Sequence, residues 1–188
     1  MKRVLLISVL LILALSISFG QIAFKKGDNT ASAMVGFGST IFASGATGTI
    51  PPISAAFDYG YNENISLGGI LSITGSKEEG NVGAGLGYKF TYSYIIIAAR
   101  GAYHYDLLHN DKVDTYGGLM IGYDIASSSS ELTGTWPAYY PTPTAASVGG
   151  FSAGLFIGGR YFFSPQLAAQ VELGYGIAYL NVGIAYKL

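Results

Sequence analysis

The sequence has no cysteine among its 188 residues, and charged side chains make up only 11% of it. The absence of cysteine excludes a disulfide framework and a lipid-modified N-terminal cysteine. Its 10 basic and 11 acidic side chains form no basic patch, so nucleic acid is not an expected partner. After residue 20 no apolar run approaches the roughly 18 residues of a transmembrane helix, and the densest is YIIIAA at 94–99.

The chain is instead rich in apolar and small residues, with 50% hydrophobic residues, 27 glycines and 15 tyrosines. Because a soluble domain usually carries about a quarter charged residues, part of this surface is expected to face something other than water. A basic start, an apolar run at 4–15 and small residues before Gln21 indicate a cleavable secretory signal peptide, and the run is too short for an anchor helix. We expect a signal peptide at residues 1–20 and one domain at residues 21–188.

From about residue 32 onward, apolar residues alternate with small or polar ones. This period of two indicates β-strands, rich here in Tyr, Ile, Val and Phe. We expect eight strands, at about residues 32–39, 52–61, 65–74, 90–105, 113–125, 149–163, 167–175 and 181–188.

The connections between these segments alternate in length. Tight turns are expected at 62–64, 107–112 and 164–166, and longer connections at about 40–51, 76–88 and 127–147. Transmembrane β-barrels have this asymmetry, with short periplasmic turns and long external loops, although the connection at about 176–178 is short and breaks the pattern. The sequence therefore predicts an all-β fold, an eight-stranded antiparallel up-and-down transmembrane β-barrel.

Aromatic side chains recur on the outward face where the second, fourth, sixth and eighth strands end. Amphipathic rings favour the boundary between water and lipid, so we expect a periplasmic girdle there. Its expected members are Tyr59, Tyr61, Tyr103, Tyr105, Tyr161, Phe163 and Tyr186. The last strand must pair with the first, because an open sheet edge in hydrocarbon would leave unsatisfied amides.

The C-terminal pattern of Gly183, Tyr186 and an apolar last residue, Leu188, together with the strand layout, resembles the OmpA/OmpX-like family of small outer membrane β-barrels. The resemblance is strongest to the outer membrane protein beta-barrel domains of Bacteroidota type, and it covers about residues 25–188. It implies that these three residues form an assembly signal for the outer membrane barrel-assembly machinery, with Leu188 in place of the family's usual Phe. It also implies export through the periplasm to a Gram-negative outer membrane, where lipid and lipopolysaccharide are the partners.

Side chains fill the interior of an eight-stranded barrel. The inward positions predict a near-balanced set of charges: Asp58, Arg100, Asp114, Asp124, Arg160, Glu172 and Lys187. We expect them to pair across the lumen, because a buried charge without a partner costs several kcal/mol. Many inward glycines leave a thin water path open as an alternative.

No catalytic residue, metal site or cofactor is expected. His104 and His109 lie beside a periplasmic turn, so His104, near Asp106 and Asp111, is expected to be a water-exposed rim residue rather than a general base. No set of side chains has the spacing of metal ligands. The segment GAGLGYKF at 83–90 lacks the Gly-Lys-Ser/Thr ending of a phosphate loop and is expected to form a strand.

The longest connection contains the only tryptophan, Trp136, together with Tyr139 and Tyr140. Such a loop on a rigid scaffold can bind a ligand, which the sequence does not name, but a variable surface loop is the simpler expectation. The leading hypothesis is a non-enzymatic outer membrane barrel with a structural or surface-interaction role. The alternatives are a narrow passive porin, a lipid-modifying outer membrane enzyme and a secreted soluble barrel of lipocalin type.

Overall fold

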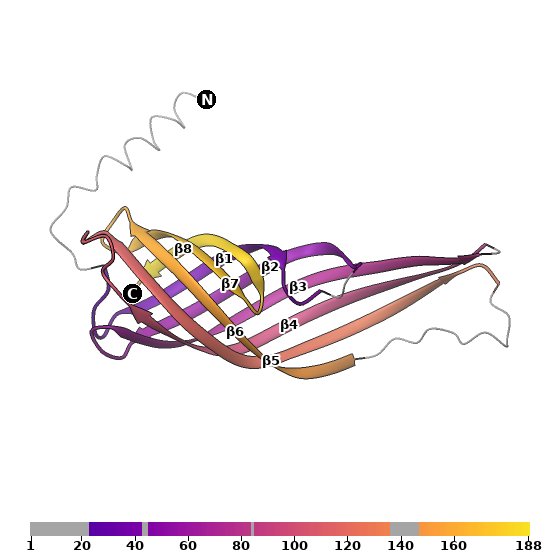
Figure 1. The fold of residues 1–188 in the computed structure, drawn as a ribbon, viewed down its shortest axis with the longest axis horizontal. Helices are drawn as coiled ribbons and strands as arrows, with labels where there is room; N and C mark the ends of the chain where they lie inside the picture. Colours follow the sequence, from indigo (N-terminus) through magenta and orange to yellow (C-terminus); the bar gives the residue numbers. More distant parts are fainter. Residues whose placement is uncertain (1–22, 43–44, 84, 136–146) are drawn as a thin grey trace, which may run out of the picture.

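A computed structural model describes residues 23–42, 45–83, 85–135 and 147–188. These residues form eight β-strands, as predicted (Figure 1). The strands are β1 (Asn29–Ser39), β2 (Thr47–Gly60), β3 (Ile65–Gly83), β4 (Leu86–His104), β5 (Val113–Thr133), β6 (Ser147–Phe162), β7 (Leu167–Tyr175) and β8 (Ala178–Lys187). Among the described residues, no helix is long and apolar enough to cross a membrane.

The sheet closes into a barrel. Each strand pairs antiparallel with its neighbours in the sequence, and β1 also pairs with β8. This seam runs from Thr30 opposite Lys187 to Ser39 opposite Ala178. Strand order and closure confirm the predicted up-and-down barrel, in which the pairing of β1 with β8 leaves neither the first nor the last strand as an open edge.

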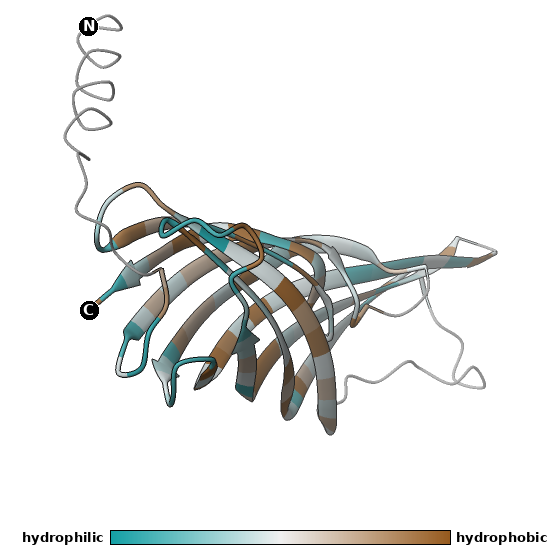
Figure 2. Cartoon of the chain, turned by 60° about the vertical axis from the view of Figure 1, so that its left-hand side comes forward, coloured by the Kyte–Doolittle hydropathy of each residue, from teal (hydrophilic) through white to brown (hydrophobic). Residues whose placement is uncertain are grey.

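Side chains of the wall alternate between the lumen and the outer surface. On β2, for example, Ile53 and Phe57 are 46% and 45% exposed, whereas Ser54 and Asp58 are 3% and 4% exposed. Figure 2 shows the resulting bands of hydrophobic and hydrophilic residues along the strands. The barrel is therefore apolar outside and contains its buried charges inside, the reverse of a water-soluble domain.

The two ends of the barrel differ. The turn end carries the connections 61–64, 105–112 and 163–166 and the last residue, Leu188. At the opposite, extended end, β3, β4 and β5 run beyond the other strands (Figure 1). The β2–β3 ladder stops at Lys77 and the β5–β6 ladder at Ser127, beyond which the three strands pair, within the described ranges, only with one another. We call residues 78–83, 86–90 and 128–133 the blade.

The blade corrects two predicted connections. The long connections predicted at 76–88 and 127–147 are wrong for residues 76–83, 86–88 and 127–133, which are paired strands. Gly83 of β3 pairs with Leu86 of β4, and Gly83 and Gly85 have the positive φ angles, 89° and 75°, that glycine permits. The composition misled the prediction because a strand with a solvated face carries the Lys, Glu and Ser residues that are also typical of loops. Residues 86–90 of GAGLGYKF do form a strand.

Candidate functional site

Buried charges form a network inside the barrel near the turn end. Asp58 of β2 lies at its centre: Oδ2 accepts a hydrogen bond from Arg160 Nη2 at 2.6 Å, and Oδ1 lies 3.2 Å from Arg100 Nε. The side chains of all three residues are at most 5% exposed. One carboxylate therefore bridges two guanidinium groups, which come from β4 and β6.

Two residues of β7 extend this network. Glu172 Oε1 accepts hydrogen bonds from Arg100 Nη2 at 2.7 Å and from the Tyr116 hydroxyl at 2.9 Å. Gln170 donates to the same oxygen at 2.9 Å and accepts from Arg160 Nε at 3.0 Å. The Arg160 guanidinium also packs on the Tyr116 ring, 4.8 Å from its centroid. These partners compensate for the water that the buried charges lose.

Asp114 of β5 links the network to a histidine and a serine. Its Oδ2 lies 3.5 Å from Arg160 Nη1, and its Oδ1 lies 2.6 Å from His104 Nδ1. On the other side of the imidazole, His104 Nε2 lies 2.9 Å from Ser66 Oγ. The Phe24 ring stacks on the imidazole with a centroid separation of 3.6 Å.

Hydrogen bonds connect Ser66, His104 and Asp114 in the same order as in a serine hydrolase triad. A substrate acyl group would have to reach Ser66 Oγ, but Ser66 is only 1% exposed and Phe24 covers the imidazole. In this arrangement the hydrogen bonds join β3, β4 and β5 and do not present a nucleophile.

The prediction that His104 is a water-exposed rim residue is wrong, because His104 is 4% exposed. The period of two does place it on the Arg100 face of β4. What the sequence does not reveal is that the segment before β1 folds back over the turn end and brings Phe24 against the ring.

Five of the seven predicted interior charges meet in this network: Asp58, Arg100, Asp114, Arg160 and Glu172. The other two do not. Asp124, half-buried further along β5, accepts a hydrogen bond from Ser152 at 2.8 Å. Lys187 Nζ lies 2.8 Å from Asp28 Oδ2 and donates to the carbonyl oxygen of Ala23 at 2.9 Å.

Sequence reasoning missed the uncharged members of the network, Ser66, Tyr116 and Gln170. All three occupy inward positions of predicted strands, so the alternation of side chains carries a signal that could have found them. Asp28 was also missed, because it precedes the first predicted strand.

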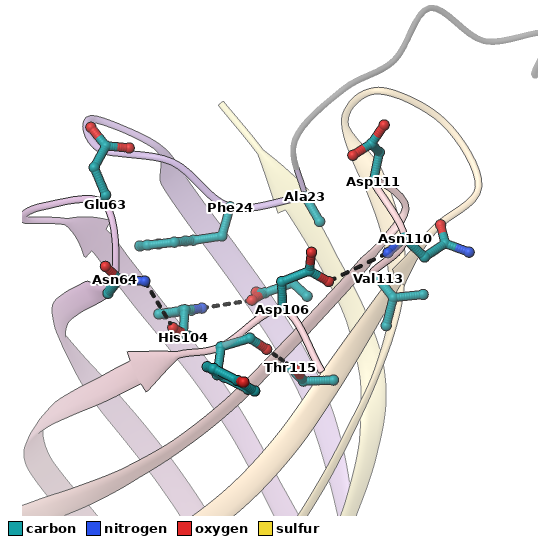
Figure 3. Close-up of a pocket in the computed structure, with 12 residues that line it drawn as sticks. Ala23, Phe24, Glu63, Asn64, His104, Asp106, Asn110, Asp111, Val113 and Thr115 are labelled. Atoms are coloured by element: carbon teal, nitrogen blue, oxygen red, sulfur yellow. Dashed lines mark hydrogen bonds and ion pairs between the residues drawn. The ribbon is translucent and has the colours of Figure 1, made fainter. Parts of the chain in front are cut away.

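A pocket of about 200 Å³ opens at the turn end (Figure 3). Phe24, Asn64, His104 and Asp114 contribute to its lining, and Asn64 Nδ2 donates to the His104 carbonyl oxygen at 3.3 Å. The part of the chain that the structure describes contains no group of three or more His, Cys, Asp or Glu residues positioned to hold a metal ion.

Towards the extended end, an apolar cluster fills the lumen. Its buried members are Met34, Ala56, Ile70, Ile96, Ala98, Ile177 and Ala178. Ile177 comes from the β7–β8 turn, which is tied to the end of β1: Thr40 N donates to Ile177 O and Gly176 N donates to Thr40 Oγ1, both at 3.1 Å. The described lumen is therefore packed at two levels, by charges near the turn end and by apolar side chains beyond them.

The residues predicted for the girdle lie on the outer surface at the turn end. Tyr59, Tyr61, Tyr103, Tyr105, Tyr161 and Tyr186 are 42–60% exposed, and Phe163 is half-buried. Of the predicted assembly signal, Gly183 and Tyr186 pair with Met34 and Ala31 in the seam, and Leu188 N donates to Asn29 O at 2.8 Å. The predicted loop residues Trp136, Tyr139 and Tyr140 lie outside the described residues.

No family model matches this sequence, and no curated protein matches it either. Among solved structures, the outer membrane protein OprG from Pseudomonas aeruginosa is 12% identical, with a TM-score of 0.50 over 89% of this chain and 99% of that chain. The N-terminal β-barrel domain of Pseudomonas aeruginosa OprF is 12% identical, with a TM-score of 0.49 over 88% and 100% of the two chains. Ail, the attachment invasion locus protein of Yersinia pestis, is 14% identical, with a TM-score of 0.47 over 87% and 99%. The similarity to OprG shows a shared barrel fold.

Proposed function

We propose that this chain is an integral β-barrel protein of a Gram-negative outer membrane, with a structural or surface-interaction role. The observation that carries the proposal is the apolar outer surface of a closed wall. Side chains about half exposed around that wall include Leu71, Ile97, Ile121, Leu155, Leu173 and Ile184. Such a belt is unfavourable in water and favourable in lipid, and a closed barrel satisfies the wall's backbone amides within hydrocarbon.

The outward residues also support limits for the hydrocarbon layer. On β3, β4 and β5 the paired outward residues change on adjacent rungs from Ile73, Ile95 and Ile125 to Gly75, Ser93 and Ser127. Because lipid-facing positions are apolar, we infer that the hydrocarbon ends at this step on the extended side. The tyrosines of the turn end suit the opposite boundary. With the turns in the periplasm, the blade would project outside the cell.

Several finer features of the proposal stay predictions. They are export directed by residues 1–20, contact with lipopolysaccharide, and recognition of Gly183, Tyr186 and Leu188 by the assembly machinery. The narrower resemblance to Bacteroidota-type domains also stays a prediction, because none of the three structures compared supports it.

Fractionation combined with gel mobility tests the membrane proposal. The protein is expected to remain with envelopes until detergent is added, and to migrate differently before and after heating, because a folded barrel resists unfolding by the gel detergent. Release by salt or alkali without detergent would contradict the proposal and favour a soluble barrel.

The packed lumen argues against a narrow passive porin. Purified protein in planar bilayers is expected to show no steady conductance, because an apolar cluster and a charge network pack the described lumen at two levels. Steady channels whose ion selectivity changes on Arg160→Gln would place an ion path through the network and contradict this prediction.

A lipid-modifying enzyme is the less favoured alternative. Hydrogen bonds connect Ser66, His104 and Asp114 in the order of a catalytic triad, but Ser66 is buried. These three residues also lie at the turn end, away from the external lipid leaflet of the proposed topology.

A further inference from the structure

The extended end carries a row of aromatic side chains that barrel closure does not require. Tyr88, Phe90, Tyr92 and Tyr94 share one face of β4, and Phe42, which follows β1, continues the row. Along the row Tyr88, Phe90, Tyr92, Tyr94 and Phe42, successive ring centroids are 5.6, 6.1, 6.3 and 5.9 Å apart. We call these five residues the aromatic ladder. All five are half-buried, so part of each ring remains accessible.

The two faces of the blade differ in charge. On the face opposite the ladder, Lys77 pairs with Glu79 at 3.1 Å and Lys89 pairs with Glu131 at 3.4 Å. On the ladder face, the only charged side chain among the described blade residues is Glu78, which stands opposite Phe90 in the β3–β4 register. The ladder face therefore combines aromatic rings with one carboxylate.

Small and polar residues of β3 flank the rings. Ser76, opposite Tyr92, has a buried hydroxyl that makes no hydrogen bond among the described residues. A Cβ at Gly80 would lie 2.6 Å from Tyr88 Cε1, so this ring extends across β3. Burial, and then the nearby Glu78 carboxylate, raise the pKa of Tyr92 above its ordinary value of 10.0.

From this arrangement we infer that the aromatic ladder binds an uncharged glycan chain. A pyranose ring is close in width to a phenyl ring and presents C–H groups to an aromatic face. A row of such rings can hold successive sugar units, just as aromatic side chains of single-stranded nucleic-acid-binding proteins stack successive bases without a sequence preference. The Glu78 carboxylate can accept hydrogen bonds from sugar hydroxyls.

The charges on the two faces of the blade favour an uncharged glycan over other extended polymers as the ligand. A polyanion is disfavoured because the one charge that the described blade residues place on the ladder face is negative, whereas Lys77 and Lys89 lie on the opposite face and are paired. The inference gives a ligand class to the surface-interaction role proposed above. It rests on that proposal for the outward position of the blade, whereas binding by purified protein can be measured without it.

Affinity electrophoresis of the full-length folded protein in detergent tests this inference. Separate gels contain hydroxyethylcellulose, dextran or mannan as neutral glycans, and heparin as the polyanion. At least one neutral glycan is expected to retard the wild type, and heparin is not. Phe90→Ser and Tyr92→Ser are each expected to raise the dissociation constant for the retarding glycan by about tenfold or more, in line with the loss of one stacking ring.

Matched variants separate stacking from general damage. Tyr92→Phe keeps the ring and is expected to bind like the wild type, as is Thr91→Ala on the opposite face of the same strand. Heat-modifiable mobility reports folding for every variant. Should a serine variant fail to fold, Glu78→Gln probes the same face without removing a ring, and weaker retardation is expected.

Three outcomes would overturn the glycan inference: no retardation by any of the neutral glycans, retardation by heparin alone, or an equal loss of binding in Thr91→Ala. Failure of the membrane proposal looks different. A protein that leaves envelopes without detergent and still binds a neutral glycan would contradict the membrane location and support the ladder.

Discussion

Asp58 joins the two buried arginines of the lumen. Asp58→Asn preserves its shape but removes the negative charge, which leaves Arg100 with Glu172 and Arg160 with Asp114 at a longer 3.5 Å. Breaking a buried ion pair typically costs about 3–5 kcal/mol, because a desolvated charge loses its partner. The free energy of unfolding, measured by urea titration in detergent micelles, is expected to fall by about that amount.

Asp124→Asn is the matched control. Asp124 is half-buried, and its partner is the Ser152 hydroxyl rather than a guanidinium. A loss of about 1 kcal/mol is expected, typical of one hydrogen bond. Equal losses in the two variants would show that Asp58 has no special role in the network.

The inward position of most network residues could be predicted from the sequence, but their partners could not. A period of two assigns a side chain to one face of a strand, whereas its partner depends on the register between strands. Asp58 and Arg160 are 102 residues apart in the chain, and no local pattern specifies that they meet. Strand alternation also predicts the inward position of Lys187, but it cannot identify its partner Asp28, which precedes β1.

The seam between β1 and β8 depends on a glycine. A Cβ at Gly183 would meet the carbonyl oxygen of Ala33 and lie 2.7 Å from Met34 Cα, and these backbone atoms can move only if the strands separate. Gly183→Ala is therefore expected to reduce the heat-modifiable, folded fraction after refolding into detergent. Gly69→Ala, where the added Cβ would lie 3.6 Å from the carbonyl oxygen of Ala98, an ordinary contact distance, is expected to fold like the wild type. Wild-type yields of folded Gly183→Ala would contradict this account of the seam.

Strand bounds were predictable where short turns enclose a strand and less predictable at the extended end. Strand β7 has the predicted bounds, because the turn before it and Gly176 after it limit the alternation on both sides. In β3 and β4 the alternation continues past the predicted ends, but the outward residues become polar. That change resembles the start of a loop, although it accompanies a change from lipid-facing to water-facing surface.

The whole barrel is expected to respond to a new charge according to its depth. Leu119 lies midway along the lipid-facing part of β5 and is 66% exposed on the outer surface. Leu119→Arg is expected to lower the free energy of unfolding in lipid vesicles by about 2–4 kcal/mol, because the charge enters hydrocarbon near the midplane. Ser129→Arg, on the same outward face of β5 but beyond the proposed boundary, is expected to have little effect. A similar loss of unfolding free energy at both positions would contradict the proposed boundary.

Lys187 donates a hydrogen bond to the carbonyl oxygen of Ala23, a residue 164 positions earlier. A short peptide could therefore link residues 188 and 23 into a circular chain. A circularly permuted chain that is opened at the β3–β4 turn would have its termini at the extended end, and every strand would keep its neighbours. The encounter of β1 with β8 would then change from the longest-range event of folding into an ordinary hairpin. Since contacts between distant parts of a chain form slowly, the pairing of β1 with β8 is expected to be the slowest step in forming this barrel.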